Sequence, residues 1–317
     1  MEKYDVIIVG GAAAGLTAGL YAGRRALKTL VLTKTIGGQA SLTTEIENYP
    51  GVEIISGAVL MNQFKTQAEK FGVEIRESEV TKIEKYGEGF LVKTMNEEFE
   101  SLSLILSFGL SHRKLNVPGE KELTGRGVAY CATCDGPLFK NKIVAVVGGG
   151  NSAFDAAEFL ADICQKVYLL TRTDQYKAEQ VLIDAVKNKT NVEILNFTEI
   201  KEILGERKVE KIKIINNQTQ EEKEIDLNGV FIEAGYVTQT EMVKNLVALD
   251  EKGQIIVDSE CKTNVNGIFA AGDVTNAPFK QVVISAGEGA KAALSANRYV
   301  KNLKGVEDKP DWQRRKK

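Results

Sequence analysis

The two cysteines of the sequence CATCD, Cys131 and Cys134, are the residues best suited to chemistry. A CxxC pair can ligate zinc, close a structural disulfide, or open and close as a dithiol that carries electrons. A closed zinc site needs four ligands, but Cys164 and Cys261 stand alone and His112 is the single histidine. We therefore expect a redox-active dithiol and no metal site.

The composition is that of an ordinary globular protein. The 317 residues, 43% of them hydrophobic, suffice for about two domains with cores of their own. The net charge of −2 provides no basic field for nucleic acid. No run approaches the roughly 18 apolar residues of a membrane helix, and the start MEKYDVIIVGG lacks the features of a signal peptide. We expect a cytoplasmic protein with neither nucleic-acid nor membrane partners.

An internal repeat surrounds the cysteines. Residues 6–34 and 144–172 each contain an apolar run, a Gly-rich turn, an Ala-rich helical stretch and a second apolar run. Aligning Gly10 with Gly148 also aligns Thr33 with Thr171, where the second runs end. This pattern is typical of a βαβ unit that opens on a dinucleotide-binding fingerprint.

The two fingerprints differ at one position. The second copy has the complete pattern Gly148-x-Gly150-x-x-Ala153, whereas the first has Ala12 between Gly10 and Gly15. One such motif is weak evidence, and the turns could belong to βαβ units that bind no nucleotide. Two copies in register, each between a strand and a helix, predict an α/β protein with two dinucleotide-binding domains.

The first copy also contains additional residues, at about 35–52. This stretch is rich in Gly, Thr and Asn and lacks helical or strand periodicity, and a loop of that length is usually functional. We interpret it as a loop that wraps the far end of a larger dinucleotide. FAD is therefore expected in the first domain and a nicotinamide nucleotide in the second.

Five blocks of the chain together resemble the low-molecular-weight thioredoxin reductases. They are GGQ at 37–39, TTEIENYPG at 43–51, CATCDGPLF at 131–139, GGGNSA at 148–153 and FAAGDVTNAPFKQVVISAGEGAKAA at 269–293. The resemblance covers residues 1–300 and implies two Rossmann-like domains of the three-layer ββα type. It places the NAD(P)-binding domain, with the redox CxxC, at 113–243, inserted in an FAD-binding domain formed by 1–112 and 244–317. It also implies a homodimer.

The resemblance implies cofactor contacts residue by residue. The FAD contacts are Gly10, Gly11, Ala14 and Gly15 at the pyrophosphate, Thr33, Gly37, Gly38 and Gln39 toward the ribose and flavin, Asn48 beside the isoalloxazine, Val80 at the adenine, Asp273 at the ribityl chain, and Lys280, Gln281 and Val282 at a helix that faces the flavin pyrimidine ring. The NAD(P) contacts are Gly148, Gly150, Asn151, Ser152, Ala153, Arg172 and Lys177.

The family's chemistry defines an electron path through the cysteines. NADPH reduces FAD, FAD reduces the Cys131–Cys134 disulfide, and the dithiol reduces thioredoxin. By resemblance Cys134 faces the flavin and Cys131 attacks the partner. Asp135 is the candidate acid–base group, although a plain capping role is the alternative. We expect the two domains to rotate about linkers near 110–117 and 236–243.

The chain departs from the family at the NADPH phosphate site. The family's His-Arg-Arg-x-x-x-Arg is here Thr171-Arg172-Thr173-x-x-x-Lys177, and Lys binds phosphate only as a point charge. No acid stands at Thr171 for the ribose of NADH. We expect NADPH, with NADH, reduced ferredoxin or a deazaflavin as alternative donors and a non-enzymatic flavin redox sensor as the alternative class.

Three smaller expectations complete the prediction. Phe108, which replaces a Thr of the family, is expected to be a core residue, and the tail at 305–317, with Trp312, to be solvated. The length of the chain argues against the alkyl hydroperoxide reductase flavoproteins, which carry an additional N-terminal domain.

Overall fold

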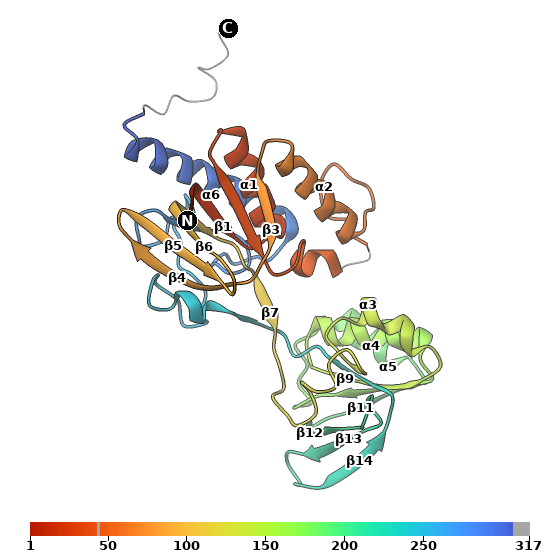
Figure 1. The fold of residues 1–317 in the computed structure, drawn as a ribbon. Coiled ribbons are helices and arrows are strands. Elements are labelled where there is room, and N and C mark those ends of the chain that lie inside the picture. The colour runs from red at the N-terminus through yellow and green to blue at the C-terminus, as the bar shows by residue number, and fades with distance from the viewer. Residues whose placement is uncertain (43–44, 307–317) are drawn as a thin grey trace. The chain divides into compact units, whose positions relative to one another are not determined.

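The structure is a computed structural model that describes residues 1–42 and 45–306, so Trp312 and the rest of the tail lie outside the described residues. The chain divides into two compact units: unit 1 contains Met1–Leu110 and Thr238–Lys317, and unit 2 contains Ser111–Val237 (Figure 1). Unit 2 is thus inserted between the two parts of unit 1. The two units therefore divide at 110/111 and 237/238, whereas we had predicted domain boundaries at 112/113 and 243/244.

Unit 1 is built on a seven-stranded sheet in the order β3-β2-β1-β6-β5-β4, with β17 also pairing with β6. Its strands are β1 (Glu2–Val9), β2 (Thr29–Thr33), β3 (Glu74–Glu77), β4 (Val80–Tyr86), β5 (Gly89–Thr94), β6 (Glu98–Leu106) and β17 (Ile268–Ala270). Its helices are α1 (Ala13–Arg24), α2 (Gly57–Glu69) and α6 (Val282–Leu303), with the 3-10 helices η1 (Gly38–Leu42) and η3 (Thr240–Val243). Strands β1, β2, β3, β6 and β17 are parallel, whereas β4 and β5 are antiparallel.

Strand β1 shows why unit 1 has three layers. Its residues Val6–Val9 are all buried, and since successive side chains of a strand point to opposite sides, both faces of the strand are covered. Val6 and Ile8 pack with alanines of α1 and α6, whereas Ile7 and Val9 pack with apolar residues of β4 and β5. The parallel sheet therefore lies between a helical layer and an antiparallel layer, and Phe108 packs against the second core, as we expected.

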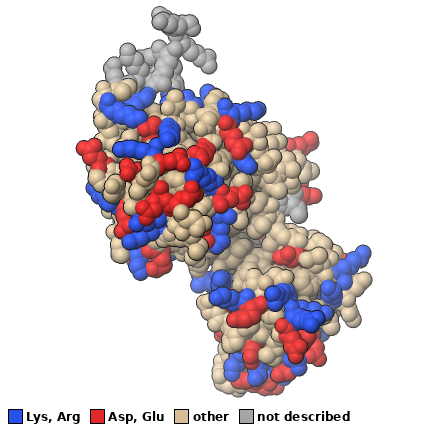
Figure 2. Space-filling view, in the orientation of Figure 1, with Lys and Arg blue, Asp and Glu red and all other residues tan. Residues whose placement is uncertain are grey.

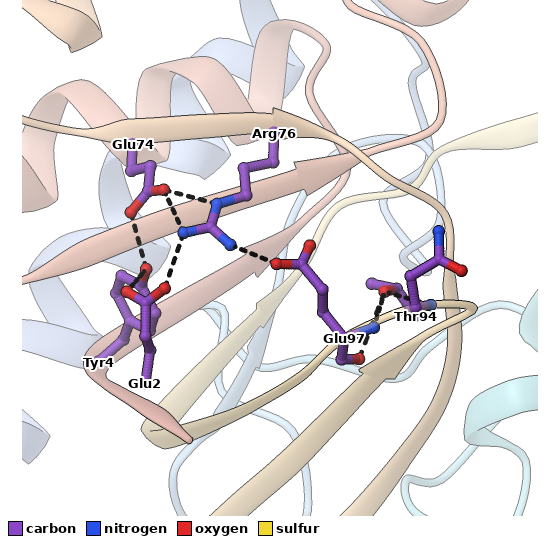
Figure 3. A network of polar contacts seen from close by, with 7 residues as sticks. Glu2, Tyr4, Glu74, Arg76, Thr94 and Glu97 are labelled. Carbon is purple, nitrogen blue, oxygen red and sulfur yellow. Dashed lines mark hydrogen bonds and ion pairs between the residues drawn. The ribbon is translucent and has the colours of Figure 1, made fainter.

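A polar network links separate strands of unit 1 (Figure 3). The guanidinium of Arg76 on β3 contacts Glu2 at 3.0 Å, Glu97 at 2.9 Å and Glu74 at 2.5 Å. The buried hydroxyl of Tyr4 on β1 donates to Glu74 at 2.7 Å. The carboxylates raise the pKa of Arg76, so the cation persists at any physiological pH and joins β1, β3 and the turn before β6.

Unit 2 repeats the architecture of unit 1 with a separate antiparallel sheet. Its parallel sheet has the order β11-β10-β9-β15-β8, and the second sheet has the order β12-β13-β14. The elements are β8 (Val128–Ala129), α3 (Ala132–Asp135), the 3-10 helix η2 (Gly136–Phe139), β9 (Ile143–Val147), α4 (Asn151–Ile163), β10 (Lys166–Leu170), α5 (Gln180–Lys187), β11 (Val192–Leu195), β12 (Thr198–Leu204), β13 (Lys211–Asn216), β14 (Glu222–Asp226) and β15 (Gly229–Ile232). Val144 and Val146 of β9 face the core that includes α4, and Ala145 faces the core that includes β12 and β13.

Both chain crossings between the units are strands. They are β7 (Leu110–His112) and β16 (Tyr236–Thr238), which pair with each other as a two-stranded sheet. They begin at the first residues of the predicted linkers, and the second predicted linker continues into η3, where Val243 is buried.

The predicted fold class, α/β with two Rossmann-like units, is confirmed. On the face shown in Figure 2, basic and acidic side chains are interspersed, in keeping with the small net charge. Among the described residues no helix is long and apolar enough to cross a membrane.

Candidate active site

The redox pair lies in unit 2, where Cys131 and Cys134 form a disulfide with their Cα atoms 5.4 Å apart. Cys131 precedes the first residue of the short helix α3, and its sulfur accepts the Cys134 N–H at 3.3 Å. Cys134 is exposed and Cys131 is half-buried. Over 1–42 and 45–306, no group of three His, Cys, Asp or Glu side chains could hold a metal ion.

A buried carboxylate holds the segment that leads into the cysteines. Glu120 is 3% exposed and accepts hydrogen bonds from the Leu115 and Asn116 N–H groups, at 3.0 and 2.6 Å, and from the Tyr130 hydroxyl at 2.6 Å. Tyr130 is the residue before Cys131. Glu120 was not predicted from the sequence, because a single Glu in a polar stretch is usually a surface residue.

Two further carboxyls near the cysteines have raised pKa values. Burial raises the pKa of Asp135, the predicted acid–base group at the end of α3. Burial raises the pKa of Glu233 to about 7, against the smaller, opposite effect of the Ala132 backbone. Glu233 was not predicted from the sequence either, since nothing in the run VFIEAG distinguishes it from a strand-end residue.

The second fingerprint connects β9 to α4. A Cβ on Gly148, whose φ is +150°, would collide with the backbone carbonyl of Glu233, so the chain's own packing requires this glycine. By contrast, a Cβ on Gly149 or Gly150 would meet no atom within 4 Å. No side chain caps α4, which begins at Asn151. An open glycine loop before an uncapped helix end suits a pyrophosphate.

The segment after β10 returns to this loop. The Lys177 N–H donates to the Gly149 carbonyl at 2.7 Å, and the Asn151 and Glu179 side chains lie within hydrogen-bond distance. Arg172 is 73% exposed and pairs with Glu199 at 3.0 Å. The structure therefore brings the predicted residues of 148–153 and the backbone at 177 together, and adds Glu199 beside Arg172.

The first fingerprint connects β1 to α1 in unit 1. A Cβ on Gly10 would collide with the Ser107 carbonyl, and one on Gly15 with the Gly10 carbonyl. A Cβ on Gly11 would collide with the side chain of Thr33. Ala14 borders Gly272 and Gly289, so α1 and α6 approach closely at this point. These glycines are required by packing, and no side chain caps α1.

The long loop of the first copy meets the same fingerprint. The Gly37 N–H donates to the Gly11 carbonyl at 2.7 Å, and η1 then begins at Gly38, within a stretch that we had expected to be irregular. The Gln39 side chain donates to the Leu110 carbonyl at 2.6 Å. The Asn48 side chain donates to Gln281, the residue before α6, at 3.1 Å.

The predicted ribityl and flavin residues also lie in unit 1. Asp273 accepts a hydrogen bond from Ser285 at 3.1 Å, and burial raises its pKa. The Lys280 ammonium donates to the Thr275 carbonyl at 2.7 Å, and burial lowers its pKa. Of the three residues predicted to open this helix, Lys280 and Gln281 precede α6, which begins at Val282. Val80, the predicted adenine contact, is buried at the start of β4.

Comparison with known proteins agrees with this arrangement. A family model described as "Pyridine nucleotide-disulphide oxidoreductase" matches residues 4–293. The chain therefore belongs to the pyridine nucleotide-disulphide oxidoreductase family. Membership of this family implies a flavin and a pyridine nucleotide as cofactors. The predicted resemblance is confirmed by thioredoxin reductase of Listeria innocua, which is 38% identical over 303 residues and 95% of each chain.

Other relatives extend the comparison. An alkyl hydroperoxide reductase component of Staphylococcus aureus is 40% identical over 301 residues, or 94% of this chain. The solved thioredoxin reductase of Lactococcus lactis has a TM-score of 0.84 and 39% identity, covering 95% of this chain and all of that one. A ferredoxin-flavin thioredoxin reductase from Clostridium acetobutylicum has a TM-score of 0.53 and 34% identity, covering 96% of this chain and 99% of that one.

The chain spans 59% of the length of the S. aureus alkyl hydroperoxide reductase component that it matches. Its identity to that protein, 40%, and to the Listeria thioredoxin reductase, 38%, are nearly equal. Sequence identity therefore does not separate these two groups of relatives.

Proposed function

We propose that this chain is a thioredoxin-disulfide reductase that uses NADPH and FAD. The observation that carries the proposal is the Cys131–Cys134 disulfide, which lies in the same unit as the open Gly149–Gly150 loop. A structural disulfide does not require a nucleotide loop beside it, whereas a redox pair does require a source of electrons.

The residues present fit both cofactors. The fit to a pyridine nucleotide rests on Gly149 and Gly150, because their missing side chains leave room that the protein itself does not fill. The fit to FAD rests on the half-buried Asp273, whose carboxylate suits the hydroxyl groups of a ribityl chain. When bound, FAD would supply the two-electron chemistry between a hydride donor and a disulfide.

Each residue of the redox segment has a role in the proposal. The Cys131 thiolate attacks a disulfide of thioredoxin and forms a mixed disulfide, and the Cys134 sulfur then displaces the reduced partner. Asp135 holds the proton that the leaving thiolate takes. Its raised pKa keeps it protonated to a higher pH than an ordinary Asp.

NADPH is the proposed donor because Arg172, the arginine of the family pattern that this chain keeps, offers an exposed guanidinium to a 2′-phosphate. NADH remains the alternative nucleotide, since Thr173 and Lys177 replace two arginines of the family pattern. Reduced ferredoxin or a deazaflavin is the alternative donor of another class. The similarity to the C. acetobutylicum ferredoxin-flavin enzyme favours including it.

A second candidate partner is an alkyl hydroperoxide-reducing protein. The 40% identity to the S. aureus alkyl hydroperoxide reductase component supports it. Thioredoxin is preferred because the Listeria thioredoxin reductase matches over 95% of both chains. We further propose that the protein is cytoplasmic and forms a homodimer. Light scattering of the purified protein would test the homodimer.

An anaerobic titration tests the proposed function. The purified chain, loaded with FAD, is mixed in turn with NADPH, NADH and reduced ferredoxin, and flavin absorbance and free thiols are followed. We expect NADPH to bleach the flavin and to open the Cys131–Cys134 disulfide, so that thioredoxin is reduced. Cys134→Ser should keep the bleaching but lose thioredoxin reduction, whereas full turnover in this variant would overturn the dithiol mechanism.

A further inference from the structure

One face of α6 holds the turn at 272–275, which contains Asp273. The Ser285 hydroxyl donates to the Asp273 carboxylate at 3.1 Å. Three residues further along the helix, the Glu288 carboxylate accepts the backbone N–H of Gly272 at 2.8 Å. Residues at this spacing lie on the same face of a helix, so two neighbouring side chains of α6 contact two consecutive residues of the turn.

The turn itself is closed around Gly272, which is buried and has a φ of +80°. The Thr275 N–H and hydroxyl both donate to the Gly272 carbonyl, at 2.9 and 2.8 Å. The Lys280 ammonium donates in turn to the Thr275 carbonyl at 2.7 Å. The carbonyl of Gly272 is thus satisfied from within the turn, and its N–H by the Glu288 carboxylate. Because a buried N–H without an acceptor is unfavourable, Glu288 favours this conformation of the turn over others.

The same part of α6 lies against the first fingerprint. A Cβ on Gly289 would collide with the Ala14 carbonyl, and a Cβ on Gly272 would lie 2.9 Å from the Ala14 Cβ. Ala14 belongs to the first turn of α1 and is a predicted pyrophosphate contact. Helix α6 therefore joins the residue predicted at the ribityl chain, Asp273, to the residues predicted at the pyrophosphate.

We propose that Ser285 and Glu288 are positioning residues of the FAD site. Glu288 holds the Gly272 N–H and so keeps the turn in the conformation in which the Asp273 carboxylate binds the ribityl hydroxyl groups. Ser285 orients the same carboxylate by a direct hydrogen bond. The inference rests on the FAD-binding role proposed above, and the effect of both residues on the cofactor passes through Asp273.

The physical reason is the cost of selecting one conformation of the turn. Without the Glu288 carboxylate, the Gly272 N–H needs another acceptor, and a glycine readily adopts other backbone conformations. When only a fraction of the molecules has the turn in the binding conformation, the apparent dissociation constant rises by the inverse of that fraction. We expect about one molecule in ten to keep it, so that FAD binds about tenfold more weakly.

The test measures FAD affinity by titrating the full-length apoprotein with FAD and following flavin fluorescence. Glu288→Leu removes the acceptor and should weaken FAD binding about tenfold. Glu288→Gln keeps an oxygen that can accept the Gly272 N–H, so its affinity should stay within about twofold of the wild type. Glu251→Leu makes the same substitution at an exposed carboxyl of unit 1 and should match the wild type. Equal affinities of Glu288→Leu and the wild type would overturn the inference.

A double-mutant cycle distinguishes positioning of Asp273 from a general loss of structure. Asp273→Ala removes the carboxylate that Glu288 is proposed to position. In that background Glu288→Leu should weaken FAD binding by about twofold or less, because the two residues act as a unit. A merely structural role predicts the same loss with and without the Asp273 carboxylate, and that result would overturn the inference.

Ser285→Ala covers the case in which Glu288→Leu does not fold. It leaves Glu288 in place and removes the hydrogen bond to Asp273, so FAD affinity should fall about threefold. The fall should vanish in the Asp273→Ala background, and an equal fall there would show that α6 does not act through this carboxylate. A wild-type chain that does not bind FAD would overturn the proposed function itself, whereas additive losses in a chain that binds FAD would overturn this inference alone.

Discussion

The hydroxyl of Tyr130 donates a 2.6 Å hydrogen bond to the carboxylate of Glu120, which is 3% exposed. Because Tyr130 is bonded directly to Cys131, this contact anchors the redox segment to the loop at 115–120. The same carboxylate also accepts the N–H groups of Leu115 and Asn116. The anchor is therefore a single buried charge that satisfies three donors.

Removal of this anchor should destabilise the protein. Glu120→Ala leaves three donors without their acceptor, and we expect it to lower the free energy of unfolding by about 3–5 kcal/mol. Tyr130→Phe removes one donor and should cost about 1–2 kcal/mol. Denaturant titration measures both effects. The exposed Glu122→Ala is the control and should change little; equal losses in all three variants would contradict the assignment.

Substitutions at two glycines of the second fingerprint should separate folding from nucleotide binding. Gly148→Ala places a Cβ against the Glu233 carbonyl, so we expect a loss of stability of about 3 kcal/mol or more. Gly150→Ala meets no protein atom and should leave stability within about 1 kcal/mol of wild type. Gly150→Ala should nevertheless weaken NADPH binding about tenfold in a fluorescence titration. Unchanged affinity would argue against a nucleotide at this loop.

Asp135→Asn should slow the exchange step. A general acid contributes about 10²–10⁴ in rate, and Asp135 must be protonated to act. Its raised pKa means that the wild-type rate falls as pH rises through that pKa. The variant should be slow and should lack this fall. Stopped-flow reduction of a small disulfide measures the rates, with the exposed Asp162→Asn as control. A wild-type rate in Asp135→Asn would leave only the capping role.

Glu233 should also make the stability of the oxidised protein depend on pH. Its pKa rises from 4.5 to about 7 on folding, so its contribution is complete below about pH 4.5 and is lost as pH rises to about 7. Relative to Glu233→Gln, the wild type should lose about 2–3 kcal/mol over that interval. Unfolding titrations at the two ends of the interval measure the difference. Equal pH dependence in both proteins would show that the carboxyl titrates normally.

Glu199 should reduce the preference for NADPH over NADH. It pairs with Arg172 at 3.0 Å and so competes with a 2′-phosphate for the guanidinium. The pair is exposed and is worth about 1 kcal/mol at most. Glu199→Gln should therefore raise the ratio of kcat/KM for NADPH over NADH about three- to fivefold. The control is Glu193→Gln. A fall in the ratio would mean that Glu199 holds Arg172 in its binding position.

Much of the fold could be predicted because its signals are local in the sequence. Apolar runs, glycine turns and Ala-rich stretches identified both βαβ units, since each signal lies within about 30 residues. The insertion of one unit in the other followed from the resemblance. A helix opening at 280–282 was also predicted, and α6 begins at Val282. The 3-10 helix at Gly38–Leu42 was not, because its short span carries no periodicity.

The chemistry of CATCD could likewise be inferred from residue types and spacing, because a CxxC pair is close enough to close on itself. The environment of that pair could not. Glu120 and Glu233 come from loops that lie 11 and 102 positions from Cys131 in the chain. Which carboxyls become buried there, and which N–H groups they accept, depends on how β8, β9 and β15 align in one sheet. Such pairing between distant segments determines which carboxyls are buried and so shifts their pKa values. Composition and residue spacing do not predict this pairing.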